Sequence, residues 1–445
     1  MRLIPFVILL AGGPLIPAAA QKKMDAATES RRLFVDNVLN ISETMVNDVT
    51  PPATACRFYA YSILTAYEVA LIAGRPVPDF THKFKTRLAI NKPALPKDFN
   101  FEFCANYAML ETGRRMMPQG AGLAGYQTAM ARRFEKEKKI PKASMSGNIA
   151  FAVAVAEQVV QYARTDGYSK LSTYARYTPS KKEGYWYPTP PAFLAAADAH
   201  WSKIRPFFLD SVTQFKPAPP TPFSKDSTSA FYQLAKEVYL ARKNMTDDQR
   251  VFANFWDCNP FTLEYSGHME VGIKKISPGG HWLGITGIAC KQAKVSLDTV
   301  ILIHTGVALA LHDAFIVCWY QKFHHQRLRP ETYINKYIDP GWRPLLQTPP
   351  FPDYTSGHST VSPAASAVLT YFLGAHFSYI DTSEVIYGLP ERRFESFYNA
   401  AKEASQSRIY GGIHFRDACD EGFKMGTRIG DYMVLTMFDH VNPAH

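Results

Sequence analysis

Apolar residues recur at helical spacing along most of the chain. Near its start, Leu33, Phe34, Val38, Ile41 and Met45 follow one another mostly at steps of three or four, which places them on one face of a helix. The same spacing predicts helices over residues 53–72, 101–117, 122–138, 145–164, 297–322, 360–373, 391–406 and 420–438. Proline-rich breaks separate these segments, without the short turns typical of strands. The sequence therefore predicts an all-α protein.

Proline-rich and irregular stretches divide the helices into groups. Residues 165–191 are rich in Tyr, Pro, Gly and Lys and predict a long loop, either a lid or an irregular wrap over the core. We favour the wrap. Four prolines between Pro217 and Pro222 mark a boundary between two helical halves. The predicted units are an N-terminal helical region, 21–222, and a C-terminal helical bundle, 223–445.

The segment 297–320 is apolar for most of its 24 residues, which is long enough to cross a membrane. However, Asp298, His304, His312 and Asp313 lie within it, and each would be costly in lipid. We therefore predict the central buried helix of a bundle, and no integral membrane span.

The first 20 residues have the pattern of a secretory signal. Arg2 precedes the apolar run Leu3–Leu10, and Ala18-Ala19-Ala20 offers a cleavage site before Gln21. We expect the mature protein to begin at Gln21 and to be exported, either to a periplasm or out of the cell.

Composition narrows the class further. Of the 445 residues, 47% are hydrophobic and 20% charged, as in a globular protein with a substantial core. The net charge of +10 attracts anions, but no long Lys/Arg run with interleaved aromatics indicates nucleic acid, so we expect none as a partner. The six cysteines are scattered and assign no disulfides; Cys318, in an apolar helical run, is predicted to lie in the core.

Three stretches carry candidate chemistry. In the first, 319–330, Lys322 and Arg329 are seven residues apart, so both can project from one helix face, and Pro330 is expected to end that helix. Two cations aimed the same way repel each other unless an anion lies between them. The alternative interpretation is that Lys322 and Arg329 are two solvated charges at a helix end.

The second stretch, 351–359, directly precedes a predicted helix. Ser356, Gly357 and His358 thus lie at a helix N-terminus, where free N–H groups and the helix dipole attract an anion. The third stretch, 407–417, places Arg408 six residues before His414 around a glycine pair. Together the stretches offer three cations, neutral donors and two imidazoles, which is a cage for a tetrahedral oxyanion.

The order Lys-x6-Arg-Pro, Ser-Gly-His and Ser-Arg-x5-His resembles the signature of the vanadium-dependent haloperoxidase and type 2 phosphatidic acid phosphatase superfamily. The resemblance covers about residues 257–420 and implies two packed helical bundles. It implies that the oxygens of vanadate or phosphate are bound by Lys322, Arg329, Ser356, Gly357 and Arg408. His414 would then bond vanadium or attack phosphorus, and His358 would be the acid–base group. Lys322 would polarise the bound peroxide.

The stretch departs from the phosphatase pattern in two places: Thr355 stands where proline is usual before Ser-Gly-His, and Ala418 where aspartate is usual after the last histidine. The carboxylate that orients His414 is therefore left open, with Asp417, or Asp257 acting through Arg408, as the candidates.

Two aromatic residues help to distinguish the two functions that this resemblance implies, haloperoxidase and phosphatase. Trp319 and Phe351 match positions that line the halide pocket of vanadium chloroperoxidase-like enzymes, although both can equally be core packing. The favoured function is thus a vanadium-dependent haloperoxidase that oxidises halide with hydrogen peroxide to hypohalous acid, iodide most easily, with bromide open. The alternative is an exported soluble acid phosphatase that hydrolyses phosphomonoesters through a phosphohistidine. A protein that sequesters phosphate or vanadate without turnover, and a zinc hydrolase, rank below both.

Overall fold

The computed structural model describes residues 25–266, 269–272 and 274–438. The all-α prediction is confirmed: within this part of the chain there are 13 α-helices and only two short antiparallel hairpins. The predicted signal, residues 1–20, lies outside the described residues.

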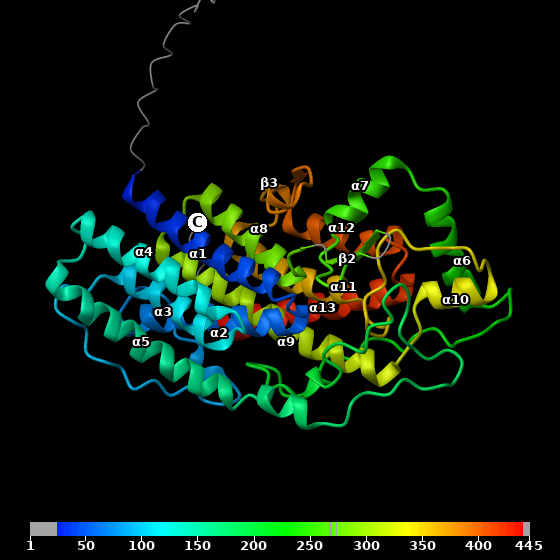
Figure 1. Ribbon diagram of the computed structural model, residues 1–445, viewed down its shortest axis with the longest axis horizontal. Coiled ribbons are helices and arrows are strands. Elements are labelled where there is room, and N and C mark those ends of the chain that lie inside the picture. Colours follow the sequence, from blue (N-terminus) through cyan, green and yellow to red (C-terminus); the bar gives the residue numbers. More distant parts are fainter. Residues whose placement is uncertain (1–24, 267–268, 273, 439–445) are drawn as a thin grey trace, which may run out of the picture.

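The first five helices form one end of the molecule, on the left of Figure 1. They are α1 (Ala26–Asn47), α2 (Pro52–Ile72), α3 (Phe101–Met116), α4 (Leu123–Lys136) and α5 (Lys142–Arg164). All five confirm predicted helices to within a few residues. Residues 165–229 contain only short 3-10 turns, at Tyr168–Thr173 and Trp201–Lys203; others occur at Thr81–Lys83 and Gly120–Gly122.

The remaining helices include those that carry the predicted site. They are α6 (Ala230–Lys243), α7 (Asp247–Phe255), α8 (Pro278–Ala293), α9 (Leu297–His325), α10 (Pro330–Tyr337), α11 (Gly357–Leu373), α12 (Phe397–Tyr410) and α13 (Arg416–Phe438). The hairpins pair β1 (Leu263–Ser266) with β2 (Met269–Gly272), and β3 (Tyr379–Asp381) with β4 (Arg392–Phe394). A 3-10 turn, Val385–Tyr387, lies between β3 and β4.

Helix α9 runs through the centre of the molecule (Figure 1). It packs against α2, α8, α11 and α13, and one continuous core cluster contains residues from both sides of the predicted boundary at 217–222. Two segments, Lys142–Thr173 and Leu297–His325, are long and apolar enough to cross a membrane, but the most apolar window of the second is entirely buried within the protein. The prediction of a buried central helix is confirmed.

The two carboxylates of α9, Asp298 and Asp313, are hydrogen-bonded inside the protein. Asp298 accepts two hydrogen bonds from Arg75, at 2.7 and 2.8 Å. Asp313 accepts from the backbone N–H groups of Phe207 and Phe208, at 2.8 and 2.9 Å. The bonds to Asp313 tie the irregular segment after α5 to the central helix, and those to Asp298 tie the loop after α2 to it. A buried carboxylate is stable only when it is bonded.

Residues 165–191, for which the sequence favours a wrap over a lid, contact the core at Trp186. Trp186 is fully buried, and its backbone N–H donates to the carbonyl of Gln326 at 2.7 Å. Leu328 donates in turn to the carbonyl of Gly184 at 3.0 Å. The segment therefore contacts the turn after α9, close to the predicted site.

Two predicted helix boundaries are wrong. Helix α9 ends at His325, because Gln326 adopts a left-handed conformation (φ 51°), and Pro330 begins α10 instead of ending α9. Proline suits a first helical position, where its missing N–H costs nothing. The helix predicted at 391–406 begins only at Phe397, since residues 392–394 pair as β4.

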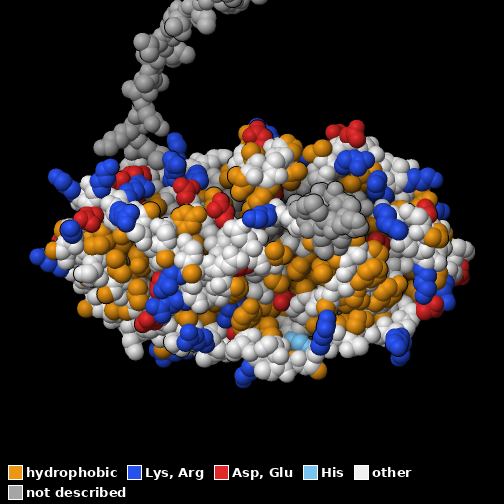
Figure 2. Space-filling view, viewed as in Figure 1, with side chains coloured by type: hydrophobic (Ala, Val, Ile, Leu, Met, Phe, Trp, Pro, Cys, Tyr) orange, Lys and Arg blue, Asp and Glu red, His pale blue; other side chains and the backbone are white. Residues whose placement is uncertain are grey.

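Basic and acidic side chains are interspersed over the face of the molecule seen in Figure 2. On the described part of that face the Lys and Arg side chains do not gather into one patch.

Candidate oxyanion site

Lys322 lies three residues before the end of α9 and is fully buried. Its Nζ donates to the carbonyls of Pro352 and Asp353, at 3.0 and 3.1 Å. Burial, together with the smaller effect of the nearby Arg329, lowers the pKa of this ammonium to about 7. An adjacent anion would strongly stabilise the charged form of this buried lysine.

Arg329 is the residue that precedes α10, and it too is fully buried. It donates from Nε to the carbonyl of Phe351 at 2.8 Å and from Nη1 to the carbonyl of Ile413 at 2.7 Å. Its Nη2 has no hydrogen-bond partner among the described residues. Burial lowers the pKa of this guanidinium to about 10.

Arg408 lies in the last turn of α12 and is 1% exposed. It donates from Nη2 to the carbonyl of Trp256 at 2.6 Å and from Nε to Ser407 Oγ at 2.9 Å. Burial lowers its pKa, and Asp257 partly opposes this effect. Asp257 itself pairs with Lys275, so it does not reach His414 through Arg408 as predicted.

The N-terminus of α11 completes the set of donors. Ser356 caps the helix: its Oγ accepts from the backbone N–H of Ser359 at 3.3 Å and from Ser359 Oγ at 2.9 Å. Gly357 is the first residue of α11 and lines the cavity described below. The prediction of a helix N-terminus at Ser356-Gly357-His358 is confirmed.

The carboxylate that orients His414 is Asp353, and the prediction of Asp417 or Asp257 is wrong. The imidazole Nδ1 lies 2.7 Å from Asp353 Oδ1. With its Nδ1 proton donated to that carboxylate, His414 has its lone pair on Nε2, on the opposite side of the ring, where Arg329 Nη1 lies at 3.1 Å. Burial, followed by the charge of Arg329, lowers the pKa of His414 well below its usual value.

Asp417 acts on His414 only indirectly, through Arg327 and Asp353. It accepts two hydrogen bonds from Arg327, both at 2.7 Å. The same guanidinium donates to Asp353 Oδ2, from Nε at 2.8 Å and from Nη2 at 2.5 Å. Arg327 thus neutralises and fixes the carboxylate that orients His414.

His358 lies in the first turn of α11 with Nε2 unpartnered among the described residues. The ring also bonds the backbone of Trp256, the residue whose carbonyl accepts from Arg408. Burial first, then the charge of Arg408, lowers the pKa of His358 well below its usual value. An uncharged imidazole with a free nitrogen can accept a proton.

A narrow cavity of about 30 Å³ connects these groups. Of the predicted site residues, the cavity is lined by Trp319, Phe351, Gly357, His358, Arg408 and His414. Lys322, Arg329 and Ser356 lie outside its lining. Lys322 and Arg329 both donate to backbone carbonyls of residues 351–353, which include the lining residue Phe351. Arg329 Nη1 also lies 3.1 Å from His414 Nε2.

The aromatic pair forms an apolar wall of the cavity. The ring centroids of Trp319 and Phe351 are 5.0 Å apart, and Phe315 packs beside Trp319 at 5.2 Å. Lys322 Nζ lies 5.1 Å from the centre of the Phe351 ring. These rings are therefore both core packing and cavity lining, so the two interpretations made from the sequence are compatible.

The charge balance of the site favours an anion. Of three buried cations, Arg408 lines the cavity and Lys322 and Arg329 lie behind its lining, and the carboxylate nearest to His414, Asp353, is bonded to Arg327 and His414. The unpartnered Arg329 Nη2 and His358 Nε2 are polar atoms whose burial is costly without a ligand. These residues fit an oxyanion such as vanadate, and His414 Nε2 would be its nitrogen donor.

Comparisons with known proteins agree with this geometry. Residues 302–443 match the family model of the second helical-bundle domain of vanadium chloroperoxidase. One similar solved structure is the crystal structure of the first bacterial vanadium-dependent iodoperoxidase, whose sequence is 37% identical to this chain. The match has a TM-score of 0.85 and covers 93% of this chain and 97% of that one. A search of curated protein sequences gave no match.

A more distant pair of structures shares the fold alone. The holo form of a bacterial vanadium-dependent chloroperoxidase is 14% identical with a TM-score of 0.66, over 88% of this chain and 93% of that one. Its apo form is 15% identical with a TM-score of 0.62, over 87% and 94%. The fold and site define an oxyanion-binding protein of helical bundles. The identity and coverage of the iodoperoxidase then show that the chain belongs to the vanadium-dependent haloperoxidase family.

Proposed function

We propose that this protein oxidises iodide with hydrogen peroxide, using vanadate held among Lys322, Arg329, Arg408 and His414. The observation that carries the proposal is the set of three buried cations in or directly behind the lining of one small cavity, next to His414. The 37% identical bacterial iodoperoxidase supports iodide as the halide. When bound, vanadate would supply a Lewis-acidic centre that activates peroxide.

Residues of the chain itself would bind the oxyanion and hold its nitrogen ligand in place. Lys322, Arg329 and Arg408 would bind and neutralise oxyanion oxygens, together with the N–H of Gly357 and the hydroxyl of Ser356. His414 would offer Nε2, while Asp353 and Arg327 keep its ring in place. The second-sphere carboxylate also fixes the tautomer, as is usual for a metal-binding histidine.

His358 would move the proton that peroxide releases. Its Nε2 faces no partner among the described residues, its ring lines the cavity, and its lowered pKa keeps the ring unprotonated, so that Nε2 has a free position for the proton. Lys322, whose pKa rises toward its usual value beside an anion, would polarise the reacting oxygen.

The cavity also suits the halide. Trp319 and Phe351 present apolar faces at its wall, and an apolar wall favours a large, weakly hydrated anion over water. Iodide is therefore the expected substrate, and bromide the next to test. The product would be hypohalous acid.

The test is a paired assay on one preparation, with and without added vanadate: iodide plus hydrogen peroxide, and a phosphomonoester. We expect iodide oxidation that depends on vanadate. Hydrolysis of the phosphomonoester without vanadate, together with no iodide oxidation in its presence, would overturn the proposal and assign the site to an acid phosphatase.

A further inference from the structure

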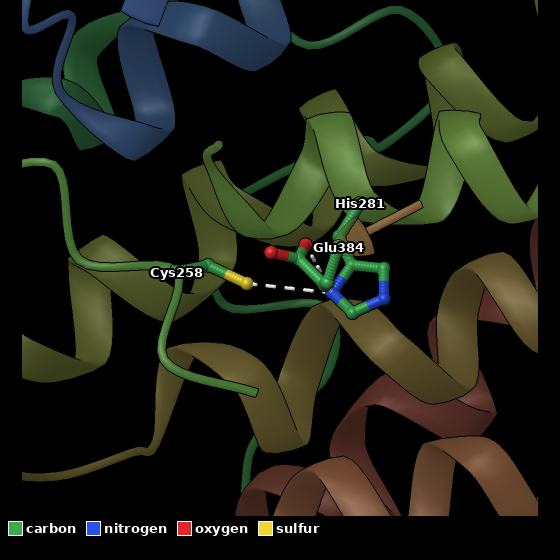
Figure 3. A group of neighbouring side chains, drawn as sticks. All are labelled: Cys258, His281 and Glu384. Atoms are coloured by element: carbon green, nitrogen blue, oxygen red, sulfur yellow. Dashed lines mark hydrogen bonds and ion pairs between the residues drawn. The ribbon is translucent and has the colours of Figure 1, made fainter. Parts of the chain in front are cut away.

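A second buried cluster lies behind the wall of the cavity. Cys258, His281 and Glu384 point toward one another, as Figure 3 shows. They come from three separate segments: the loop after α7, the start of α8, and the insertion between β3 and β4. None of them was singled out from the sequence, because 23 residues separate the first two and about 100 the second and third.

The three side chains offer the donor atoms of a zinc site. A thiol, an imidazole and a carboxylate are the usual ligands of Zn²⁺. Cys258 Sγ lies 3.5 Å from His281 Nδ1, which in turn lies 3.2 Å from Glu384 Oε1. Tetrahedral zinc with ordinary bond lengths separates a sulfur and a nitrogen ligand by about 3.6 Å, and a nitrogen and an oxygen ligand by about 3.4 Å. The observed spacing matches both.

The far side of the imidazole is held as in a metal-binding histidine. His281 Nε2 lies 2.9 Å from Asp381 Oδ2. Asp381 Oδ1 is itself fixed by the backbone N–H of Ser383 at 2.9 Å and its hydroxyl at 2.7 Å. A proton on Nε2 directs the Nδ1 lone pair at Cys258 and Glu384. Carboxylate–histidine pairs of this kind orient first-sphere ligands in metal proteins.

One atom of the cluster lacks an ordinary partner. Glu384 Oε1 accepts no hydrogen bond among the described residues, although its side chain is only 4% exposed. A thiol proton can satisfy His281 Nδ1, but Glu384 Oε1 then faces an imidazole nitrogen without a proton at 3.2 Å, and two such acceptors repel each other. A divalent cation between the three atoms would satisfy all of them.

We propose that Cys258, His281 and Glu384 bind a zinc ion that joins three segments behind the vanadate site, with a solvent molecule in the fourth position. The cluster adjoins the site in two ways. Cys258 lines the cavity, and the ring of Trp256 stacks on His281 with centroids 4.5 Å apart. Because the carbonyl of Trp256 accepts from Arg408, the zinc ion would rigidify a wall of the cavity.

The test uses the full-length protein, loaded with zinc chloride, dialysed, and analysed for zinc and vanadium separately. We expect about one zinc per chain in the wild type, and a loss of it in Cys258→Ala and Glu384→Gln. Asp381→Asn should weaken zinc binding by about 10–100-fold, as second-sphere changes do. The matched control is Cys290→Ala, which removes another fully buried thiol from α8 and should keep its zinc.

Substitution with cobalt gives an independent readout. Co²⁺ bound to Cys258 should show a sulfur-to-metal charge-transfer band that is absent from Cys258→Ala and present in Cys290→Ala. Wild-type protein that retains no zinc after dialysis, or zinc retained equally by Cys258→Ala, would overturn the proposal. Neither outcome depends on iodide oxidation, so the zinc site and the proposed function fail independently.

Discussion

Asp353 connects the two electrostatic tasks of the candidate site. One carboxylate oxygen holds His414 and the other accepts from Arg327. Asp353 forms no direct ion pair with Lys322 or Arg329, although its charge opposes the lowering of the pKa of both. The three cations therefore remain available to bind the oxygens of an oxyanion, while Asp353 secures the orientation of His414.

Arg329→Ala is the sharpest test of the cage. It removes a buried cation whose Nη2 is free for a ligand, so vanadate affinity should fall by about 2–5 kcal/mol, as for a broken buried charge pair. Vanadate titration measures the change. Arg416→Ala is the control, since this partly exposed arginine pairs with Glu237 and should leave the affinity unchanged. Equal affinity in wild type and Arg329→Ala would mean that the cage is misassigned.

His358→Ala tests the proton transfer separately from binding. Vanadate should stay bound, because the three cations and His414 are intact. Turnover of iodide should fall by about 10²–10⁴-fold, the usual contribution of a general acid–base group. The pH profile should also lose the rise or fall that the titration of His358 causes. The measurement is steady-state iodide oxidation across pH at saturating vanadate. Full activity at every pH would remove His358 from this role.

At the scale of elements, periodicity located the helices and failed at their junctions. The apolar spacing placed α2 and α9 almost to the residue. It missed the break at Gln326, where one left-handed residue ends α9 four residues before Pro330. A single dihedral change leaves no periodic signal, so the two cations, expected on one helix, lie on either side of a turn.

The residue types of the site were readable from the sequence, but some of their pairings were not. Lys322, Arg408 and His358 lie near the cavity as expected, because each stands beside a turn or a helix end. Asp353 was missed as the partner of His414, since the contact spans 61 residues and depends on the packing of the turn before α11 against the turn before α13. Only the folded chain shows this contact.

Helix α2 carries a buried acid that makes stability depend on pH. Glu68 is 5% exposed, and burial, with the nearby Asp79, raises its pKa from 4.5 to about 8. A carboxyl whose folded pKa is raised stabilises the fold fully below its unfolded pKa. That contribution is lost as the pH rises from about 4.5 to about 8, at up to about 1.4 kcal/mol per pH unit.

Glu68→Gln should therefore flatten the decline of unfolding free energy over this range and make the protein more stable than wild type at pH 8. Urea unfolding at several pH values measures the difference, which isolates Glu68 from other titrating groups. Glu135→Gln, at an exposed position of α4, is the control and should follow the wild-type curve. An unchanged slope in Glu68→Gln would show that this carboxyl titrates normally.

At the scale of the whole molecule, the placement of its thiols suits the proposed product. All six cysteines are buried and unpaired. Hypohalous acid oxidises accessible thiols, and exposure governs that susceptibility. A protein that releases such an oxidant gains from keeping its thiols away from solvent, and of the six only Cys258 lines the cavity.

We propose, on the pattern of residues 1–20, that the protein is exported and begins at Gln21. Cleavage there would leave the described fold complete, because α1 starts at Ala26 and its cap, Asp25, accepts from the N–H of Thr28 at 2.9 Å. Sequencing the N-terminus of protein from the native host should find Gln21 first, in the exported fraction. Ala18→Arg should block cleavage, because the site requires a small residue there, and should leave a longer chain. An intact Met1 on wild-type protein in the cytoplasm would refute export.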